Sequence, residues 1–360
     1  MSGKAVLIRC DGSPEIGLGH VVRCLALADE LCRVHQLSVA FAMRHSPPTF
    51  EMVRRKGYPV LTPQPDKQQL LPPQPDQQQP FDYRRWIEEA IDTVDAGALI
   101  LDVRDDLPRQ VVDIWRRQGI LIAVLDDPGE RRLAADLAFY PPVPQVQRLD
   151  WRGFTGQLQA GWEWVVLRPE FAHPPLSPSR PFHSKPLVLV TMGGSDPAGL
   201  TLLAARALDT LAEDFEAVLV PGPAFQQRET LEILLAGARR SFTVQSPGDD
   251  LPGLMSQADM AIISFGITAY ELAALGVPAI YLCLTGDHAE SASSLVAAGF
   301  GKSLGVFSQM SQQALADAVR EFLTRGASGP PMTSRLIDGR GAERIARRIA
   351  DRLREHSIYA

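Results

Sequence analysis

The sequence is poor in cysteine, in excess basic charge and in long apolar runs. It holds four cysteines, Cys10, Cys24, Cys32 and Cys283, and none forms a CxxC pair or lies near a histidine at zinc-ligand spacing. Cys24 and Cys32 share one face of an expected helix, where we interpret them as small buried apolar groups. We therefore expect no metal ion and a reduced, cytoplasmic compartment.

The charge and the hydropathy exclude two classes of partner. Lysine and arginine number 36 against 42 aspartates and glutamates, a formal net charge of −6. Binding of a nucleic-acid polymer relies on a basic surface, so we expect no nucleic-acid partner. No apolar run approaches the ~20 residues of a membrane span, and the apolar start of the chain runs directly into Asp11, unlike a signal peptide. We therefore expect neither a span nor a leader.

Two common nucleotide-binding motifs are also missing. Gly17 and Gly19 are followed by Val21 and Val22, so the third glycine of the dinucleotide fingerprint is absent. No Gly-Lys-Ser/Thr follows any glycine run, which excludes a P-loop. A dinucleotide-dependent oxidoreductase is therefore disfavoured.

What the sequence does contain is a regular alternation of apolar runs and amphipathic segments. The expected strands are residues 5–10, 37–43, 98–102, 120–126, 187–191, 217–220, 260–264 and 279–284. The expected helices are residues 21–32, 82–94, 107–118, one from about 197, one ending near 238, 267–275 and 341–355. Apolar strands that each precede a helix indicate parallel sheets covered on both faces. The pattern predicts an α/β protein with two Rossmann-like domains facing a cleft.

Composition divides the chain into these domains. We expect a first domain over residues 1–170, with a Pro/Gln-rich insertion at 62–80, and a Pro-rich linker at 171–186. A second domain over 187–340 precedes a charged amphipathic C-terminal helix within 341–360.

The most informative segment, residues 11–20, reads DGSPEIGLGH and connects the first strand to the first helix. Gly17 and Gly19 allow a tight turn and close approach to a ligand, and the helix N-terminus suits an anion. His20 stands at this terminus, which disfavours an imidazolium, so a neutral His20 can accept a proton from water. The alternative is a histidine that only caps the helix.

Two junctions in the second half repeat this strand–glycine loop–helix plan. In one, Gly193 and Gly194 allow close backbone approach, and Ser195 or Asp196 can cap the helix. The alternative is an ordinary capped loop. The other junction has Gly266 and Thr268 at a helix start, with Glu271 one turn in. The Glu271 carboxylate can bind ribose hydroxyls; the alternative is a first-turn glutamate favoured by the helix dipole. These three residues form one expected nucleotide site.

Acidic residues also gather where strands end. Two expected strands end in Asp102 and Asp126, at the edge where open α/β sheets place their ligands. We interpret the paired acids at 105–106, 126–127 and 249–250 as loop solvation or helix caps and assign them no metal ion.

Four strings together resemble a known family: RCDGSPEIGLGHVVRCLALA, LVTMGGSDPAGLT, SFGITAYELAALGVP and IDGRGAERIA. They are similar to the UDP-sugar hydrolase of the pseudaminic-acid pathway, which cleaves UDP-2,4-diacetamido-2,4,6-trideoxy-β-L-altropyranose, and to spore-coat polysaccharide biosynthesis proteins. The wider relatives are GT-B glycosyltransferases. The resemblance implies a GT-B-like fold, a UDP-sugar substrate and hydrolysis by water at the anomeric carbon, without a metal or other cofactor.

The resemblance also implies roles for single residues. His20 matches the catalytic histidine, and the substrate side is matched by Asp11, Gly17, Gly19 and Arg23. The nucleotide side is matched by Gly193, Gly194, Ser195, Gly266, Thr268 and Glu271.

Two positions depart from the family pattern. Asp287-His288 stands where the hydrolases usually carry Asn-Gln, and Val103-Arg104 stands where they often place a tyrosine. Because these changes touch the sugar side, Asp287 and His288 are candidate substrate-binding residues. Two alternatives stay open: a GT-B glycosyltransferase of surface polysaccharide biosynthesis, and a non-catalytic protein that binds a nucleotide sugar. The sequence does not fix the oligomeric state.

Overall fold

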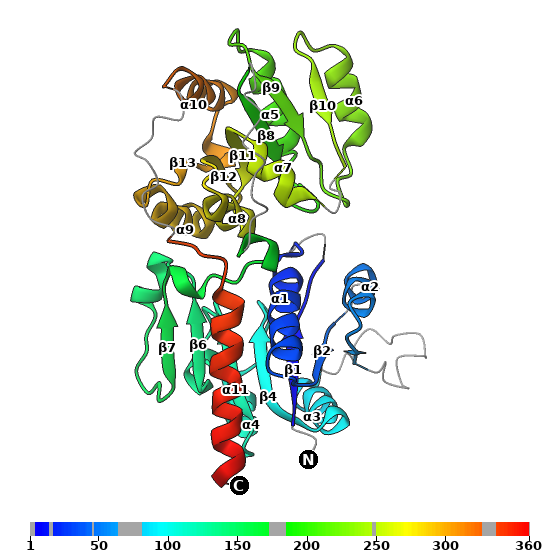
Figure 1. The fold of residues 1–360 in the computed structure, drawn as a ribbon, viewed down its shortest axis with the longest axis vertical. Helices are drawn as coiled ribbons and strands as arrows, with labels where there is room; N and C mark the ends of the chain where they lie inside the picture. Colours follow the sequence, from blue (N-terminus) through cyan, green and yellow to red (C-terminus); the bar gives the residue numbers. More distant parts are fainter. Residues whose placement is uncertain are drawn as a thin grey trace, which may run out of the picture.

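The computed structural model describes residues 4–13, 17–44, 47–63, 81–172, 185–246, 250–325 and 336–359. They form two parallel sheets covered by helices, one from each half of the chain, arranged along the long axis of the molecule (Figure 1). Most of the expected insertion and of the expected linker lies outside the described residues. The predicted α/β class with two parallel sheets is confirmed.

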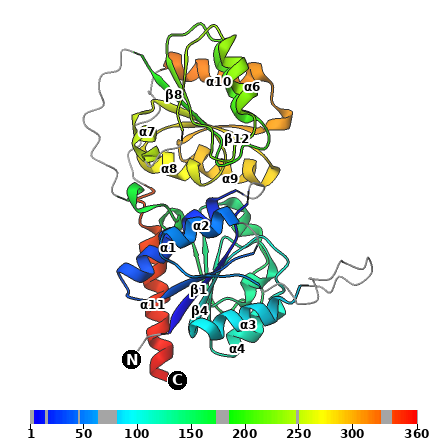
Figure 2. The same cartoon turned by 90° about the vertical axis from the view of Figure 1, so that its right-hand side faces the viewer.

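The first sheet has the strand order β3-β2-β1-β4-β5-β6-β7, with every neighbouring pair parallel. Its strands are β1 (Ala5–Cys10), β2 (Val39–Ala42), β3 (Val60–Leu61), β4 (Ala96–Asp102), β5 (Leu121–Leu125), β6 (Leu137–Tyr140) and β7 (Gln157–Ala160). Its helices are α1 (Gly19–Arg33), α2 (Pro47–Arg55), α3 (Tyr83–Val94) and α4 (Arg109–Arg117). The central strands are apolar because they are buried on both faces: α1 and α2 pack on one face, and α3 and α4 pack on the other (Figure 2).

The second sheet repeats this plan in the order β10-β9-β8-β11-β12-β13. Its strands are β8 (Leu187–Thr191), β9 (Glu216–Leu219), β10 (Phe242–Val244), β11 (Met260–Ser264), β12 (Ala279–Cys283) and β13 (Gly301–Val306). Its helices are α5 (Leu200–Asp209), α6 (Arg228–Ala236), α7 (Leu251–Gln257), α8 (Ile267–Leu275), α9 (Gly286–Ala297) and α10 (Gln312–Arg325). Helices α7, α8 and α9 share a core with one face of the sheet, and α5, α6 and α10 with the other.

The last helix returns to the first domain. Helix α11 (Gly341–Tyr359) lies along α1 and the first sheet and buries Ile345, Ile349 and Leu353 in their core (Figure 1). The return requires glycine, because a Cβ at Gly341 would overlap the Val165 carbonyl. The two passages of chain between the domains are thus packed backbone against backbone.

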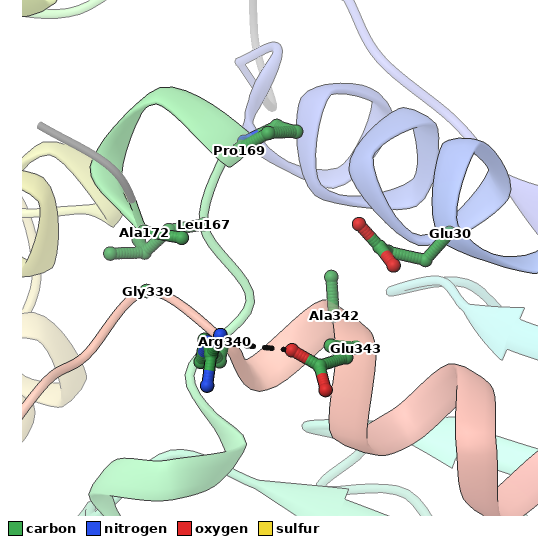
Figure 3. A pocket seen from close by; sticks show the side chains of 8 residues that line it. All are labelled: Glu30, Leu167, Pro169, Ala172, Gly339, Arg340, Ala342 and Glu343. Atoms are coloured by element: carbon green, nitrogen blue, oxygen red, sulfur yellow. Dashed lines mark ion pairs between the residues drawn. The ribbon is translucent and has the colours of Figure 1, made fainter. Parts of the chain in front are cut away.

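A cavity of about 80 Å³ lies where these passages meet α1 and α11 (Figure 3). It is lined by Glu30, Leu167, Pro169, Ala172, Gly339, Arg340, Ala342 and Glu343. An ion pair of 3.5 Å between Arg340 and Glu343 lies at its wall. None of the glycine loops predicted to bind substrate lines this cavity. We therefore assign it to the packing of the two interdomain passages and not to the reaction.

The packing of α11 gives a first prediction. Ile349→Ala deletes a fully buried side chain from the first core, and we expect it to lower the free energy of unfolding by about 2–5 kcal/mol. Urea unfolding measures this, with Arg348→Ala on the exposed face of the same turn as the control. Equal stability of the two variants would show that α11 does not belong to the first core.

Candidate active site

The predicted glycine junctions lie where each sheet reverses its strand order. In the first sheet β1 is flanked by β2 and β4, and in the second sheet β8 is flanked by β9 and β11. Open parallel sheets bind ligands beyond the carboxyl ends of strands at such a switch point. Gly19 follows β1, Gly193 follows β8 and Gly266 follows β11, so the fold places all three junctions at the two switch points.

The two switch points face each other across the domain boundary. A Cβ built on Gly19 would lie 4.0 Å from Ile267 Cγ2, and one built on Gly194 would lie 3.6 Å from the Leu18 side chain. Both distances are ordinary van der Waals contacts, so α1 and its loop pack directly against the second domain. The elements that carry His20 and the predicted nucleotide site therefore lie next to each other across the domain boundary.

His20 lies in the first turn of α1, and the aspartate that ends β4 holds it. Its Nδ1 is 2.6 Å from Asp102 Oδ1. Arg23, one turn along α1, donates from Nε to Asp102 Oδ2 at 2.6 Å and from Nη2 to Oδ1. Leu18 is the N-cap of α1 and no side chain caps this helix, so the alternative that His20 serves as a cap is wrong.

The charges of this triad fix the histidine tautomer. Burial alone would raise the pKa of Asp102, but the Arg23 guanidinium and the contact with His20 outweigh it and hold that pKa far below its usual range. A carboxylate can only accept hydrogen bonds, so Nδ1 carries the proton and donates it to Asp102. In the neutral ring this tautomer leaves the lone pair on Nε2, where it suits a general base.

Beyond Arg23 the network continues along the same edge. Asp126 follows β5 with a φ of +51°, accepts from Arg104 Nη2 at 2.8 Å and lies 3.8 Å from Arg23 Nη1. Tyr270 of α8, in the second domain, lies within electrostatic range of this network. Burial raises the pKa of its phenol, the Asp126 charge raises that pKa further, and the Arg23 charge lowers it.

The loop after β8 lies beside a helix that is already capped. Gly193 has a φ of +77° and open space where a Cβ would lie. A Cβ on Gly222, in contrast, would overlap the carbonyl oxygen of Gly193. Asp196 accepts from the N–H groups of Leu200 and Thr201 at 2.8 Å each, so α5 begins at Leu200 and not near 197. The predicted nucleotide loop, Gly193 to Ser195, therefore lies before the capped helix and not within it.

Helix α8 presents the second set of donors. Gly266 is its N-cap and offers no capping side chain, and Thr268 lies in its first turn. Glu271 lies beyond that turn, so the first-turn alternative is wrong. The Glu271 carboxyl is buried, which raises its pKa, and the neighbouring Arg168, whose Nε is 3.1 Å from Oε1, opposes this rise.

Asp11 is placed differently from the simple expectation of a substrate contact. Its Oδ2 accepts from the buried Arg9 of β1 at 2.5 Å, and its Oδ1 accepts from the Arg44 N–H at 2.7 Å. Its carboxylate therefore neutralises the buried guanidinium of Arg9 at the carboxyl end of β1. These contacts fix the start of the glycine loop.

Asp287 and His288 lie in the first turn of α9, next to the first domain. Gln145 Nε2 donates to the Asp287 carbonyl at 3.0 Å. The His288 ring lies 6.0 Å from the Phe265 ring between centroids, and its partial burial lowers its pKa, so the ring is half-buried and not fully solvated.

The motifs in the sequence do not indicate a role for several residues of this candidate site. Asp102 and Asp126 stand out in the sequence only as strand ends, and the motifs assign no function to Arg168 or Tyr270. Their position at strand ends, or next to a predicted site residue, was the available indication. The described part of the chain holds no cluster of three or more His, Cys, Asp or Glu side chains suited to a metal ion. Nor does it contain a helix long and apolar enough to cross a membrane.

The comparisons with known sequences find distant relatives. No protein-family model matches the chain. An uncharacterized protein of Methanocaldococcus jannaschii is 25% identical over 290 residues, 77% of this chain and 55% of that protein. The spore coat polysaccharide biosynthesis protein SpsG of Bacillus subtilis is 29% identical over 175 residues, 46% of this chain and 50% of that protein. The chain spans about half the length of the curated relatives it matches.

The comparisons with solved structures establish the fold. MurG of Acinetobacter baumannii superposes with a TM-score of 0.64 at 16% identity, over 98% of this chain and 99% of that one. MnaA of S. aureus, in a co-structure with UDP, superposes with a TM-score of 0.63 at 13% identity, over 98% and 97% of the two chains. A glycosyltransferase from Rickettsia africae reaches 0.61 at 12% identity, over 99% of each. The chain therefore has the predicted GT-B fold.

The buried pairing of Asp102 gives a second prediction. Asp102→Asn leaves Arg23 without its counter-charge, and we expect a loss of about 3–5 kcal/mol in the free energy of unfolding at pH 7. Because the folded pKa of Asp102 is depressed, its stabilisation is complete above the unfolded carboxyl pKa and is lost as the pH falls through the folded one. The deficit should therefore stay constant from pH 7 to about 5 and shrink below about 4.

Urea titrations across this pH range measure the effect. Asp106→Asn, which changes a carboxylate whose side chain is 89% exposed on the same loop, is the control. A deficit in Asp102→Asn that matches this control at pH 7 would contradict the buried ion pair.

Proposed function

We propose that the protein is a nucleotide-sugar hydrolase that releases UDP and a free deoxy-amino sugar, on a substrate similar to UDP-2,4-diacetamido-2,4,6-trideoxy-β-L-altropyranose. The observation that carries this proposal is the His20–Asp102 pair at the domain boundary. The loop and helix that carry His20 lie against Gly194 and Ile267 of the second domain, next to the predicted nucleotide loop and helix start.

In the proposed reaction His20 Nε2 removes a proton from water as the water oxygen bonds to the anomeric carbon. The bond from that carbon to the phosphate oxygen breaks, and its electron pair leaves with UDP. Asp102 keeps the ring oriented, and Arg23 keeps Asp102 ionised. This is the orienting role that a buried aspartate has in serine-protease triads.

The second domain is proposed to hold the leaving group. The backbone at Gly193 and Gly194 and the N-terminus of α8, whose N-cap is Gly266, are proposed to face the developing diphosphate charge. A well-placed donor set of this kind contributes roughly 3 kcal/mol to a transition state. Glu271, oriented by Arg168, is proposed to accept from the ribose hydroxyls. The UDP co-structure of MnaA and the role named for SpsG support a nucleotide sugar in polysaccharide biosynthesis.

A glycosyltransferase is the second candidate, and the solved glycosyltransferases with this fold favour it. The same histidine would then take a proton from an acceptor hydroxyl instead of water. A protein that binds the nucleotide sugar without turnover is the third candidate. Release of UDP without any acceptor distinguishes the hydrolase from both.

Replacing the base gives a third prediction. In His20→Ala, kcat should fall about 10²- to 10⁴-fold, as expected for loss of a general base, while the affinity for UDP stays within about threefold. Steady-state UDP release and calorimetry measure the two quantities, with His35→Ala beyond the end of α1 as the control. Full activity of His20→Ala would refute the assigned base.

The bond that breaks gives a fourth prediction. Turnover of a panel of UDP-deoxyaminosugars in ¹⁸O water should place the label in the free sugar, since attack occurs at carbon. Mass spectrometry of both products reads the outcome. Label in UDP would indicate attack at phosphorus and would exclude the proposed role of His20.

A further inference from the structure

Arg104 brings a cation to the carboxyl-end edge of the first sheet, and toward the described residues most of its hydrogen-bonding capacity is unused. It stands two residues beyond Asp102, and its side chain is 35% exposed. A guanidinium has five N–H donors. Toward the described residues, Arg104 makes one hydrogen bond, from Nη2 to Asp126 Oδ2 at 2.8 Å.

The backbone that carries Arg104 is held in place on both sides. Arg131, which is buried, donates from Nη2 to the Val103 carbonyl and from Nη1 to the Asp105 carbonyl, each at 2.8 Å. Its Nε binds the buried Asp127 at 2.5 Å. The side chain of Arg104 therefore extends from a fixed position, which reduces the entropy lost when it binds a ligand.

A continuous set of contacts connects Arg104 to the proposed base. Asp126 lies between Arg104 and Arg23, and Arg23 in turn binds the aspartate that orients His20. Arg104 thus lies at the same sheet edge as the proposed base, one carboxylate beyond Arg23, and in the proposed reaction this places its remaining donors toward the sugar.

The charges of this network indicate which kind of group Arg104 binds. Two guanidinium groups, of Arg23 and Arg104, are matched by two carboxylates, of Asp102 and Asp126. A carboxylate on the sugar would add an unmatched negative charge beside Asp126, whereas a neutral acceptor adds none. A carbonyl oxygen is the neutral acceptor that a charged donor binds best.

We propose that Arg104 is a specificity-determining residue that donates to the acyl oxygen of an acylamino substituent on the sugar. This inference rests on the proposed function for the presence of a nucleotide sugar. It does not depend on hydrolysis, because it concerns binding alone.

The test compares two ligands that differ in one substituent, UDP-N-acetylglucosamine and UDP-glucose, by calorimetry on the full chain. We expect the wild type to bind the acetamido ligand about 10- to 100-fold more tightly, which is the effect of one hydrogen bond from a charged donor. In Arg104→Met this preference should fall below about threefold. Arg117→Met is the matched control, because Arg117 is an exposed arginine at the C-terminal end of α4, outside the site.

A second variant separates the arginine from its partner. Asparagine tolerates the positive φ of residue 126, so Asp126→Asn removes the carboxylate charge and keeps the donors of Arg104. We expect this variant to keep at least a tenfold preference for the acetamido ligand. Loss of the preference here together with its retention in Arg104→Met would assign the discrimination to Asp126 and overturn the proposal.

Three further results also overturn it. The first is a wild-type preference for the acetamido ligand below threefold, and the second is an unchanged preference in Arg104→Met. The third is that the wild type binds UDP-glucuronate more tightly than the acetamido ligand and that Arg104→Met abolishes this difference. The last result would mean that the ligand group is a carboxylate. Absence of turnover with the binding preference intact would refute the hydrolase and leave the role of Arg104 standing, so the two failures are distinguishable.

Discussion

The arrangement of the candidate site depends on one buried carboxylate, that of Asp102 at the end of β4. A charge buried at the end of an apolar strand is destabilising unless it is paired and hydrogen bonded. Arg23 and His20 provide both, and they lie three residues apart on one side of α1. Because residues at this spacing are neighbours on a helix, the two contacts fix the rotation of α1 against the first sheet. They also determine where Nε2 points.

The two domains contribute opposite electrostatic properties to the site. In the first domain the cations already have counter-charges, since Arg23 is paired with Asp102 and Arg9 with Asp11. In the second domain the N-cap of α8 is Gly266, which offers no capping side chain, whereas α5 is capped by Asp196. A diphosphate would therefore be held by backbone donors of the second domain. This explains how a chain with a net charge of −6 can suit an anionic ligand.

The sequence predicts the parts of the fold that are locally encoded. Strands β1, β8 and β11 and helix α8 occupy the expected residues because apolar runs bounded by glycine mark them. Strand β7 was not predicted, because its residues lie largely exposed at the edge of the sheet and lack an apolar pattern. In the site, His20 and Arg23 were predicted, but their pairing with Asp102 was not. That pairing spans about 80 residues and exists only because β4 lies next to β1.

The presence of Arg23 changes what the His20–Asp102 pair does in the proposed reaction. An aspartate alone would stabilise the imidazolium that forms when His20 takes a proton. Here the Asp102 charge is already matched by Arg23, so proton uptake adds a positive charge to a locally neutral network. The negative charge needed to balance it develops across the domain boundary, on the departing diphosphate. Proton transfer to His20 and departure of UDP thus stabilise each other, and a base on one domain acts best when the leaving group is held by the other.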